Sequence, residues 1–478
     1  MIDAHLTPDE FRRHGHDVID WIADYWERVD KQPVLSTVAP GEVAGALPRS
    51  APESGESFDE VLADLDRVLL PGITHWQHPR YFAYFPANSS PAAILGDLIS
   101  SGIGAQGMIW ATSPAVTELE QVVLDWLAEA LGLPDAFLNQ GGGPGGGVIQ
   151  DTASTATFTA VLAALHRATG GAARSAGLEQ GRHAIYGSSQ AHSSLLKAAM
   201  MSGLGESAVR TIEVDPLTQA MSVDALRAAI AVDREAGVVP LMIQAAVGTT
   251  STGAFDPVPE IGVIARDCGA WLHVDAAWAG VAAICPELRW VNDGVAAYAD
   301  SYVTNPHKWL LTTFDCSTFW VRDRAALIGA LSILPEYLRN PASESGAVVD
   351  YRDWHPQLGR RFRAVKLWTV LRTYGLEGLR AHLRSGVELA EHFAGLVRDD
   401  DRFELVTPPA LGLVVFRAVG PDQVTMDLME AVNSSGTAYL SHTKVEGRTA
   451  LRLAVGGWRT TREDVDLTWR ELGRLLRP

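Results

Sequence analysis

Two residues have the side chains that an electron-withdrawing cofactor site needs. Lys308 lies in the sequence NPHKW and Asp275 in the sequence HVDAA, and each stands at or just beyond the end of an apolar run typical of a β-strand. A lysine amine forms a Schiff base with an aldehyde cofactor, and a carboxylate keeps a pyridine nitrogen protonated so that the ring accepts electrons. Together, the two residues predict a site for pyridoxal 5'-phosphate (PLP).

The composition limits the class of protein that carries this site. The chain has 478 residues, of which 47% are hydrophobic and 20% charged, so we expect a globular protein of two or three domains. Its net charge of -18 argues against nucleic acid or an anionic membrane as a main partner, because both repel acidic surfaces. A cofactor phosphate would therefore need local backbone donors.

Cysteine use and the start of the chain bear on its compartment. The three cysteines, Cys268, Cys285 and Cys316, form no CxxC pair, and no histidine cluster has zinc spacing, so we expect a reducing compartment and no metal. The first residues lack the basic and apolar regions of a signal peptide, and no apolar run is long enough to span a membrane. We expect a cytoplasmic protein.

The N-terminal pattern predicts a helix over residues 7–29. Thr7 is a suitable cap, Pro8 suits the first helical position, and Glu10 completes a capping box. The helix would carry an apolar stripe that packs either on its own domain or on a second subunit, made by Phe11, Val18, Ile22, Tyr25 and Val29. Residues 32–57 then read as an extended connector.

Between about 140 and 325, short apolar runs alternate with helical stretches. This pattern predicts a mostly parallel sheet covered on both faces. The expected strands are 182–186, 238–247, 271–275, 301–304 and 317–322. Ligands of such sheets bind beyond the carboxyl ends of the strands, and His192, Thr250, Asp275 and Lys308 all stand at or just after those ends.

The pattern changes beyond about residue 380. Strands are expected at 403–406, 413–417 and 450–455, with helices at 423–432 and from Thr461. We therefore predict three parts: an N-terminal helical segment (1–85), a large PLP-binding domain (86–380) and a small C-terminal α/β domain (381–478).

A glycine-rich run precedes the expected phosphate site. Residues 141–147 match GxGxxG only trivially, because no strand comes before them and no acidic residue follows at the spacing of a dinucleotide site. Free amides at the start of the helix 155–169, with the hydroxyls of Thr152 and Ser154, would hold a phosphate dianion. The alternative is ordinary N-capping by Asp151 or Thr152.

Three further residues are candidates for the same site. His192 stands on the ligand edge of the sheet, where its ring would stack on the cofactor, and Ala277 is small enough to pack under the opposite face. Tyr337 lies in a polar, glycine-containing stretch typical of a lid, where a phenol would return a proton to a carbanion once water is excluded. Alternatively, Tyr337 only anchors a loop.

The segment 78–86, HPRYFAYFP, carries four aromatic residues. They predict either part of the core or the wall of an apolar pocket.

With these residues in place, the chain resembles the group II PLP-dependent decarboxylases, and within them the aromatic-L-amino-acid decarboxylases. The resemblance runs nearly end to end, in the segments PGITHW (71–76), FAYFP (82–86), SPAVTELE (113–120), GVIQ (147–150), QAHSS (190–194), GTT (248–250), HVDAA (273–277), NPHKW (305–309), DYRDW (350–354) and GRRFR (359–363).

The resemblance implies an α/β fold of the aspartate aminotransferase type (fold type I) and a homodimer with active sites at its interface. It implies Lys308 as the Schiff-base lysine, Asp275 as the partner of the pyridine nitrogen and Tyr337 as the proton donor to Cα. Its remaining cofactor-binding residues are His192, Ala153, Ser154, Thr250, Asn305 and His307. The substrate pocket is implied to contain Trp76, Tyr84, Phe85, Pro86, Ala87 and Gly359, with Met108 supplied by the other subunit.

The chain departs from the pattern of its relatives at four positions, without losing a catalytic group. Trp278 replaces a Tyr and Thr155 a Glu, whereas Ala87 in place of Thr and Met108 in place of Phe leave the substrate range open. Gly359 leaves room for a bulky ring, which favours tryptophan. The other candidates are 5-hydroxytryptophan, phenylalanine, tyrosine and DOPA.

Other functions fit parts of the same pattern. An aromatic aldehyde synthase consumes oxygen and releases ammonia and peroxide, but that sister class typically carries Phe at the position of Tyr337. An aminotransferase shares the fold, and a decarboxylase of another amino acid such as histidine shares the chemistry; an acidic substrate would need a cation that the pocket sequence does not offer. A PLP-binding scaffold without turnover would not need all four of Lys308, Asp275, His192 and Tyr337.

Overall fold

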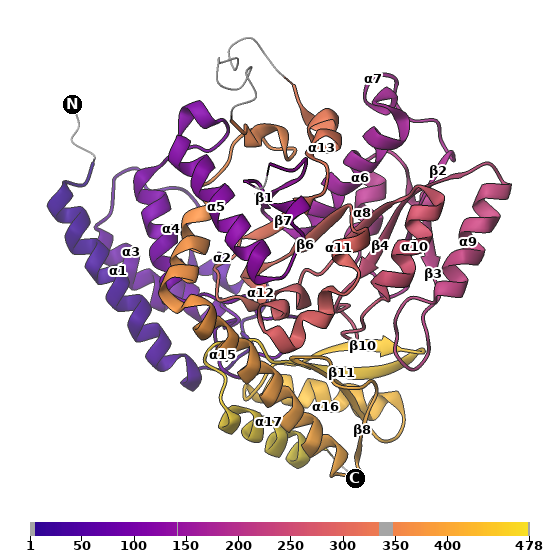
Figure 1. Ribbon diagram of the computed structural model, residues 1–478. Coiled ribbons are helices and arrows are strands. Elements are labelled where there is room, and N and C mark those ends of the chain that lie inside the picture. Colours follow the sequence, from indigo (N-terminus) through magenta and orange to yellow (C-terminus); the bar gives the residue numbers. More distant parts are fainter. Residues whose placement is uncertain (1–4, 141, 334–347, 477–478) are drawn as a thin grey trace.

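The structure, a computed structural model, describes residues 5–140, 142–333 and 348–476 and contains two β-sheets with helices packed around them (Figure 1). The helices that precede the first strand are α1 (Pro8–Arg28), α2 (Glu42–Ala46), α3 (Phe58–Asp64), α4 (Pro91–Ile103) and α5 (Pro114–Ala130). None of the described helices is long and apolar enough to cross a membrane.

Helix α1 confirms the predicted N-terminal helix. Thr7 caps it, and Thr7 and Glu10 form the expected capping box. Of all the residues in α1, only His14 is buried, whereas Phe11 and Ile19 are 61% and 44% exposed. The apolar stripe is therefore covered only in part by its own chain.

The larger sheet has seven strands in the order β1-β7-β6-β5-β4-β2-β3. Its strands are β1 (Gly146–Gln150), β2 (His183–Ser188), β3 (Val209–Ile212), β4 (Val239–Ala246), β5 (Trp271–Asp275), β6 (Ser301–Thr304) and β7 (Ser317–Val321). Strands β3, β2, β4, β5 and β6 run parallel, whereas β7 is antiparallel to both β6 and β1. The predicted mostly parallel sheet is thus confirmed.

Helices cover both faces of this sheet (Figure 1). One face carries α6 (Ala153–Thr169), α8 (Ser194–Met201) and α13 (Arg324–Leu331), and the other carries α5, α9 (Val223–Glu235) and α10 (Val258–Cys268). Three shorter helices are α7 (Ala172–Ala176), α11 (Val295–Tyr298) and α12 (Pro306–Trp309). Because both faces are buried, the central strands are apolar throughout, which is why their positions were predictable.

Two strands of this sheet were not predicted. β3 is a short edge strand with the mixed sequence VRTI, and β1 begins in the glycine-rich run. A Cβ atom at Gly147 would lie 2.6 Å from the Trp320 ring on the neighbouring β7, so close packing explains this glycine. The run therefore packs a strand rather than binding a nucleotide.

The C-terminal part contains a separate four-stranded antiparallel sheet in the order β10-β11-β9-β8. Its elements are β8 (Phe403–Leu405), β9 (Leu413–Ala418), α16 (Asp422–Ser435), β10 (Ser441–Val445), β11 (Arg448–Ala454) and α17 (Arg462–Leu475). Helix α15 (Ala364–Arg398), bent at Gly375, leads into it. The division predicted at residue 380 falls inside α15, and β10 was not predicted.

The aromatic segment lies against this second sheet. The Phe82 amide donates to the Tyr439 carbonyl at 2.9 Å, and the Ala454 amide donates to the Phe82 carbonyl at 3.0 Å. Tyr81 and Phe82 are buried, so part of the run belongs to the core. Phe85, the last aromatic residue of the run, lines the cavity described next.

Candidate active site

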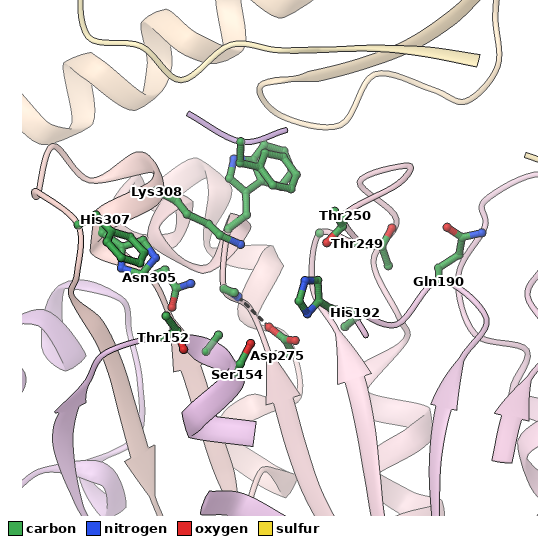
Figure 2. Close-up of a pocket in the computed structure, with 17 residues that line it drawn as sticks. Thr152, Ser154, Gln190, His192, Thr249, Thr250, Asp275, Asn305, His307 and Lys308 are labelled. Carbon is green, nitrogen blue, oxygen red and sulfur yellow. Dashed lines mark hydrogen bonds between the residues drawn. The ribbon is translucent and has the colours of Figure 1, made fainter. Parts of the chain in front are cut away.

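A cavity of about 210 Å3 lies at the carboxyl ends of the parallel strands (Figure 2). It brings together every residue predicted to bind the cofactor: Thr152, Ala153, Ser154, His192, Thr250, Asp275, Ala277, Asn305, His307 and Lys308. The other lining residues are Phe85, Gln190, Ala246, Gly248, Thr249, Trp278 and Phe314. This position is where ligands of open α/β sheets bind.

Lys308 is presented to the cavity by the short helix α12, directly after β6. Its amine lies 5.4 Å from the centroid of the Phe85 ring. Burial lowers the pKa of this amine below its usual range, Asp275 opposes the shift, and Arg452 adds to it. A lowered pKa favours the neutral amine, which is the nucleophilic form that reacts with an aldehyde.

Asp275 ends β5, and both of its carboxylate oxygens are held by the protein. Gln244 on β4 donates from Nε2 to Oδ2 at 3.0 Å, and the Ala277 amide donates to Oδ1 at 3.2 Å. Gln244 is fully buried. These two donors fix the orientation of the carboxylate, and Gln244 is a contributor that the sequence reasoning missed.

His192 follows β2 and lines the cavity, as the close-up shows (Figure 2). The Ser194 amide donates to its Nδ1 at 3.1 Å, so Nε2 carries the proton of the neutral ring. Its pKa is lowered, chiefly by burial of the ring and further by Lys308 and Lys197, while Asp275 opposes. A neutral ring at this edge suits stacking on a flat cofactor.

The N-terminus of α6 forms one end of the cavity. Thr152 caps the helix by accepting from the Thr155 amide at 3.5 Å, so the capping predicted as an alternative is present. Capping does not exclude phosphate binding, because the first amides of a helix lack intrahelical acceptors and attract anions. Ala153 and Ser154 both line the cavity there.

Asn305 and His307 complete this side of the site. The Ser317 hydroxyl donates to Asn305 Oδ1 at 2.6 Å, which leaves the Asn305 amide nitrogen as its available donor. The Cys316 amide donates to His307 Nδ1 at 2.9 Å, and burial, helped by Lys308, lowers the pKa of His307 to about 3. His307 is therefore a neutral ring whose Nε2 is a donor.

Stacked aromatic rings form one wall. The centroids of Phe85 and Trp278 are 4.3 Å apart with ring planes 17° from parallel, and those of Trp278 and Trp309 are 5.4 Å apart at 20°. Phe85 and Trp278 line the cavity, so the aromatic run does contribute to a pocket. Such a wall excludes water and supplies an apolar surface.

The remaining residues predicted to contact substrate do not line this cavity. Trp76 and Tyr84 are 41% and 51% exposed and stack with 6.1 Å between centroids. Ala87 accepts from Gln77 through its carbonyl, and Pro86 packs beside Gly456. Gly359 lies in a separate hollow with Gln106. Met108, two residues after Gln106 in the sequence, is half-buried. Tyr337 lies outside the described residues.

Arg452 is the second residue that the sequence reasoning missed. It lies on β11 in the C-terminal domain, yet its guanidinium carbon is 5.1 Å from the centroid of Phe85. Every residue that lines the cavity lies more than 130 positions away from Arg452 in the sequence, so the sequence gave no local signal. Only the docking of the second sheet on the aromatic segment brings it here.

Lys308, the hydrogen-bonded carboxylate of Asp275 and the N-terminus of α6 define a PLP-dependent enzyme of fold type I. The model of the pyridoxal-dependent decarboxylase conserved domain matches residues 40–419, and the chain belongs to this family. The family, the fold and the carboxy-lyase class predicted from the sequence are thereby confirmed.

The chain is similar to plant enzymes over nearly its whole length. It is 45% identical to tryptophan decarboxylase 2 of Oryza sativa subsp. japonica, covering 98% of this chain and 94% of the relative. It is also 45% identical to phenylacetaldehyde synthase of Arabidopsis thaliana, covering 97% and 95%. The crystal structure of Oryza sativa TDC with PLP and tryptamine superposes with a TM-score of 0.94, 42% identity and 99% coverage of both chains. The chain thus belongs to the family that contains the aromatic amino acid decarboxylases and aldehyde synthases.

The residues present fit PLP as the cofactor. The site offers an amine for the aldehyde, a fixed carboxylate for the ring nitrogen, a neutral ring for the flat face and a helix N-terminus for the phosphate. Gln190, which also lines the cavity, has a buried Oε1 without a hydrogen-bond partner, as expected of a polar group beside a ligand site.

Proposed function

We propose that this chain decarboxylates aromatic L-amino acids, with tryptophan preferred, to the arylalkylamine and CO2. The observation that carries the proposal is that one cavity combines all the predicted cofactor residues with an aromatic wall. Among the described residues that line this cavity, Lys308 is the only lysine or arginine. A flat, apolar side chain is the substrate feature that such a wall recognises.

When bound, PLP supplies an electron sink for the bond between Cα and the substrate carboxylate. Lys308 would hold the cofactor through its amine. Asp275, fixed by Gln244 and the Ala277 amide, keeps a proton on the ring nitrogen. His192 and Ala277 would hold the two faces of the ring and so orient it in the cavity.

Loss of CO2 leaves a carbanion that must receive a proton. Phe85 and Trp278 exclude water from the cavity, which protects the carbanion from uncontrolled protonation and strengthens the electrostatic contacts. Tyr337 supplies the phenol that returns a proton to Cα. The tyrosine at this position is the feature that favours amine formation over oxygen-dependent deamination.

The preference for tryptophan is supported by Gly359. A Cβ at this position would lie 3.2 Å from Gln106 Nε2, so a side chain there would narrow the hollow that the two residues share. A glycine keeps that space open for the larger indole ring. An acidic substrate is disfavoured because Arg452, the cation behind the wall, is already committed to protein acceptors.

We also propose that the working enzyme is a homodimer. The predicted substrate residues Trp76, Tyr84 and Gly359 lie at the surface of the single chain. Exposed apolar side chains extend over α4, where Leu95, Leu98, Ile99 and Ile103 are between 44% and 61% exposed. A second copy covering this face would bury the apolar area and close the substrate side of the site.

A decarboxylation panel tests the substrate. The purified holoenzyme is incubated with tryptophan, 5-hydroxytryptophan, phenylalanine, tyrosine, DOPA, histidine and glutamate, and the CO2 and amine are quantified. We expect the highest kcat/KM with tryptophan and no turnover of glutamate. Preferential turnover of histidine or glutamate would overturn the proposal.

Aldehyde synthase activity is the second candidate, because the similarity to phenylacetaldehyde synthase equals that to tryptophan decarboxylase 2. Measuring peroxide and ammonia beside the amine separates the two. Amine in stoichiometric yield with CO2 is expected, whereas peroxide and aldehyde as main products would assign the chain to the synthases. The matched variant Tyr337→Phe should move the products toward aldehyde.

A further inference from the structure

Arg452 is a buried cation that no carboxylate among the described residues is found to neutralise. The residue is 3% exposed, and burial lowers its pKa to about 10, which still leaves it charged at neutral pH. Two other buried cations form ion pairs, Arg360 with Glu120 and Lys366 with Asp97. A buried charge without an oppositely charged partner is costly and marks a functional position.

The guanidinium instead donates to three neutral acceptors on three separate segments. Nε donates to the Ser251 carbonyl at 3.1 Å, in the turn that presents Thr249 and Thr250 to the cavity. Another nitrogen donates to the Tyr84 carbonyl at 3.2 Å, next to the cavity residue Phe85. The third donates to the Ser441 hydroxyl on β10 at 2.8 Å.

The same guanidinium and the Lys308 amine share one aromatic ring. Their distances to the centroid of Phe85 are 5.1 Å and 5.4 Å. Four groups therefore act on Lys308: the charged Asp275 and Arg452, and the imidazoles of His192 and His307. Asp275 favours a proton on the Lys308 nitrogen, and Arg452 disfavours it.

We propose that Arg452 is a positioning residue of the active site, which ties the Phe85 wall and the Thr249–Thr250 turn to the C-terminal domain and places an uncompensated positive charge beside Lys308. The assignment rests on the PLP-dependent family of the chain and not on which aromatic substrate it prefers. The positive charge of Arg452 opposes the effect of the Asp275 carboxylate on the Lys308 nitrogen. The nitrogen therefore loses its proton easily although a carboxylate is near.

The test is a pH titration of the visible absorbance of the holoenzyme, which reports the proton on the Lys308 nitrogen. Arg452→Gln removes the charge, and we expect the midpoint to rise by about one pH unit, the effect of a unit charge at roughly 10 Å in a medium of intermediate dielectric constant. Arg452→Lys keeps the charge but not the three-way geometry, so its midpoint stays while KM rises roughly tenfold.

Two further variants separate charge from folding. Ser441→Asp places a carboxylate beside the intact Arg452 and should raise the midpoint in the same direction. Arg448→Gln, on the same strand but 47% exposed at its side chain and paired with Glu404, should leave it unchanged. Wild-type midpoints in both Arg452→Gln and Ser441→Asp, or an equal shift in Arg448→Gln, would overturn the proposal. The titration needs no turnover, so a wrong substrate assignment would not affect it.

Discussion

The predicted cofactor residues of this chain come together in one cavity, whereas most of the predicted substrate residues, here called the substrate face, do not. All ten predicted cofactor residues line one cavity, and they come from the ends of neighbouring strands and the start of α6. Of the seven predicted substrate residues, only Phe85 lines it. Of the others, Trp76, Tyr84 and Gly359 are exposed, whereas Pro86 is buried and Ala87 and Met108 are half-buried outside the cavity.

This difference separates the two tasks of the enzyme. The parallel sheet fixes the groups that bind and activate the cofactor, because strand ends place them at one edge whatever surrounds the domain. In the proposed homodimer, specificity would depend on residues that a second copy brings together. The comparison therefore predicts that changes at the sheet edge abolish the chemistry, while changes on the open face alter which substrate is used and how well.

The largest effect is expected from Lys308→Ala. Without the amine, cofactor attachment and release lose their covalent route, so CO2 release should fall by at least about 1,000-fold. Lys444→Ala, an exposed lysine on β10, is the control. Radiolabelled CO2 from carboxyl-labelled tryptophan measures the rate, and substantial turnover by Lys308→Ala would contradict the role of the cavity.

Ile103→Asp tests whether the substrate face needs a second copy. Ile103 is 61% exposed on α4, and a charge there should oppose burial of the apolar face. We expect a monomer by sedimentation, a loss of turnover of about 100-fold and retention of the visible cofactor absorbance. Leu217→Asp, at an 81% exposed site away from α4, is the control. A fully active monomer would break the comparison.

Gly359→Ser should change substrate choice rather than abolish activity. The new side chain begins 3.2 Å from Gln106 Nε2 and reduces the space for indole, so the ratio of kcat/KM for tryptophan to that for phenylalanine should fall about tenfold. Gly55→Ser, where a Cβ meets nothing within 4 Å, is the control. An unchanged ratio would remove Gly359 from the substrate site.

The smallest effect concerns the pH dependence of stability, which two buried histidines influence. Burial lowers the pKa of His273 to about 4 and of His307 to about 3, below the value of about 6.5 expected in the unfolded chain. Between these values the unfolded state binds more protons, so stability falls as pH drops from 6.5, by up to about 1.4 kcal/mol per pH unit for each histidine.

Asp256 acts in the opposite direction, because burial raises its pKa to about 6 and its protonation in the fold offsets part of the loss. The net expectation is a lower thermal unfolding midpoint at pH 5 than at pH 7. His273→Gln should reduce this difference, whereas His442→Gln, exposed on β10, should not. An identical pH dependence in all three proteins would show that the buried imidazole of His273 is irrelevant to it.

The sequence predicted the elements whose signal is local. α1 has its capping box, and strands such as Trp271–Asp275 are apolar because both faces are buried. The placement of Lys308 and Asp275 at strand ends followed from the same pattern. β1 was missed because its Gly147 is needed for close packing against the Trp320 ring on β7, a contact between distant parts of the chain that the local sequence does not indicate.

Side chains whose role depends on the packing of the C-terminal domain against the rest of the chain could not be predicted from the sequence either. Arg452 stands between Leu451 and Leu453, an alternation that predicts a polar side chain facing water. In the structure that face is covered by the aromatic segment, so the arginine is buried. Gln244 was hidden for a similar reason, since a glutamine within an apolar strand gives no indication that it holds Asp275.

The ring stack of Phe85, Trp278 and Trp309 has a spectroscopic consequence. Trp278 borders the cavity and Trp309 stacks on Trp278, so both indoles would lie within range of energy transfer to a bound cofactor, whose near-ultraviolet absorption overlaps indole emission. Resonance energy transfer will quench these two of the 14 tryptophans most strongly when the cofactor binds. The intrinsic fluorescence of the protein therefore serves as a label-free gauge of how fully each preparation is loaded.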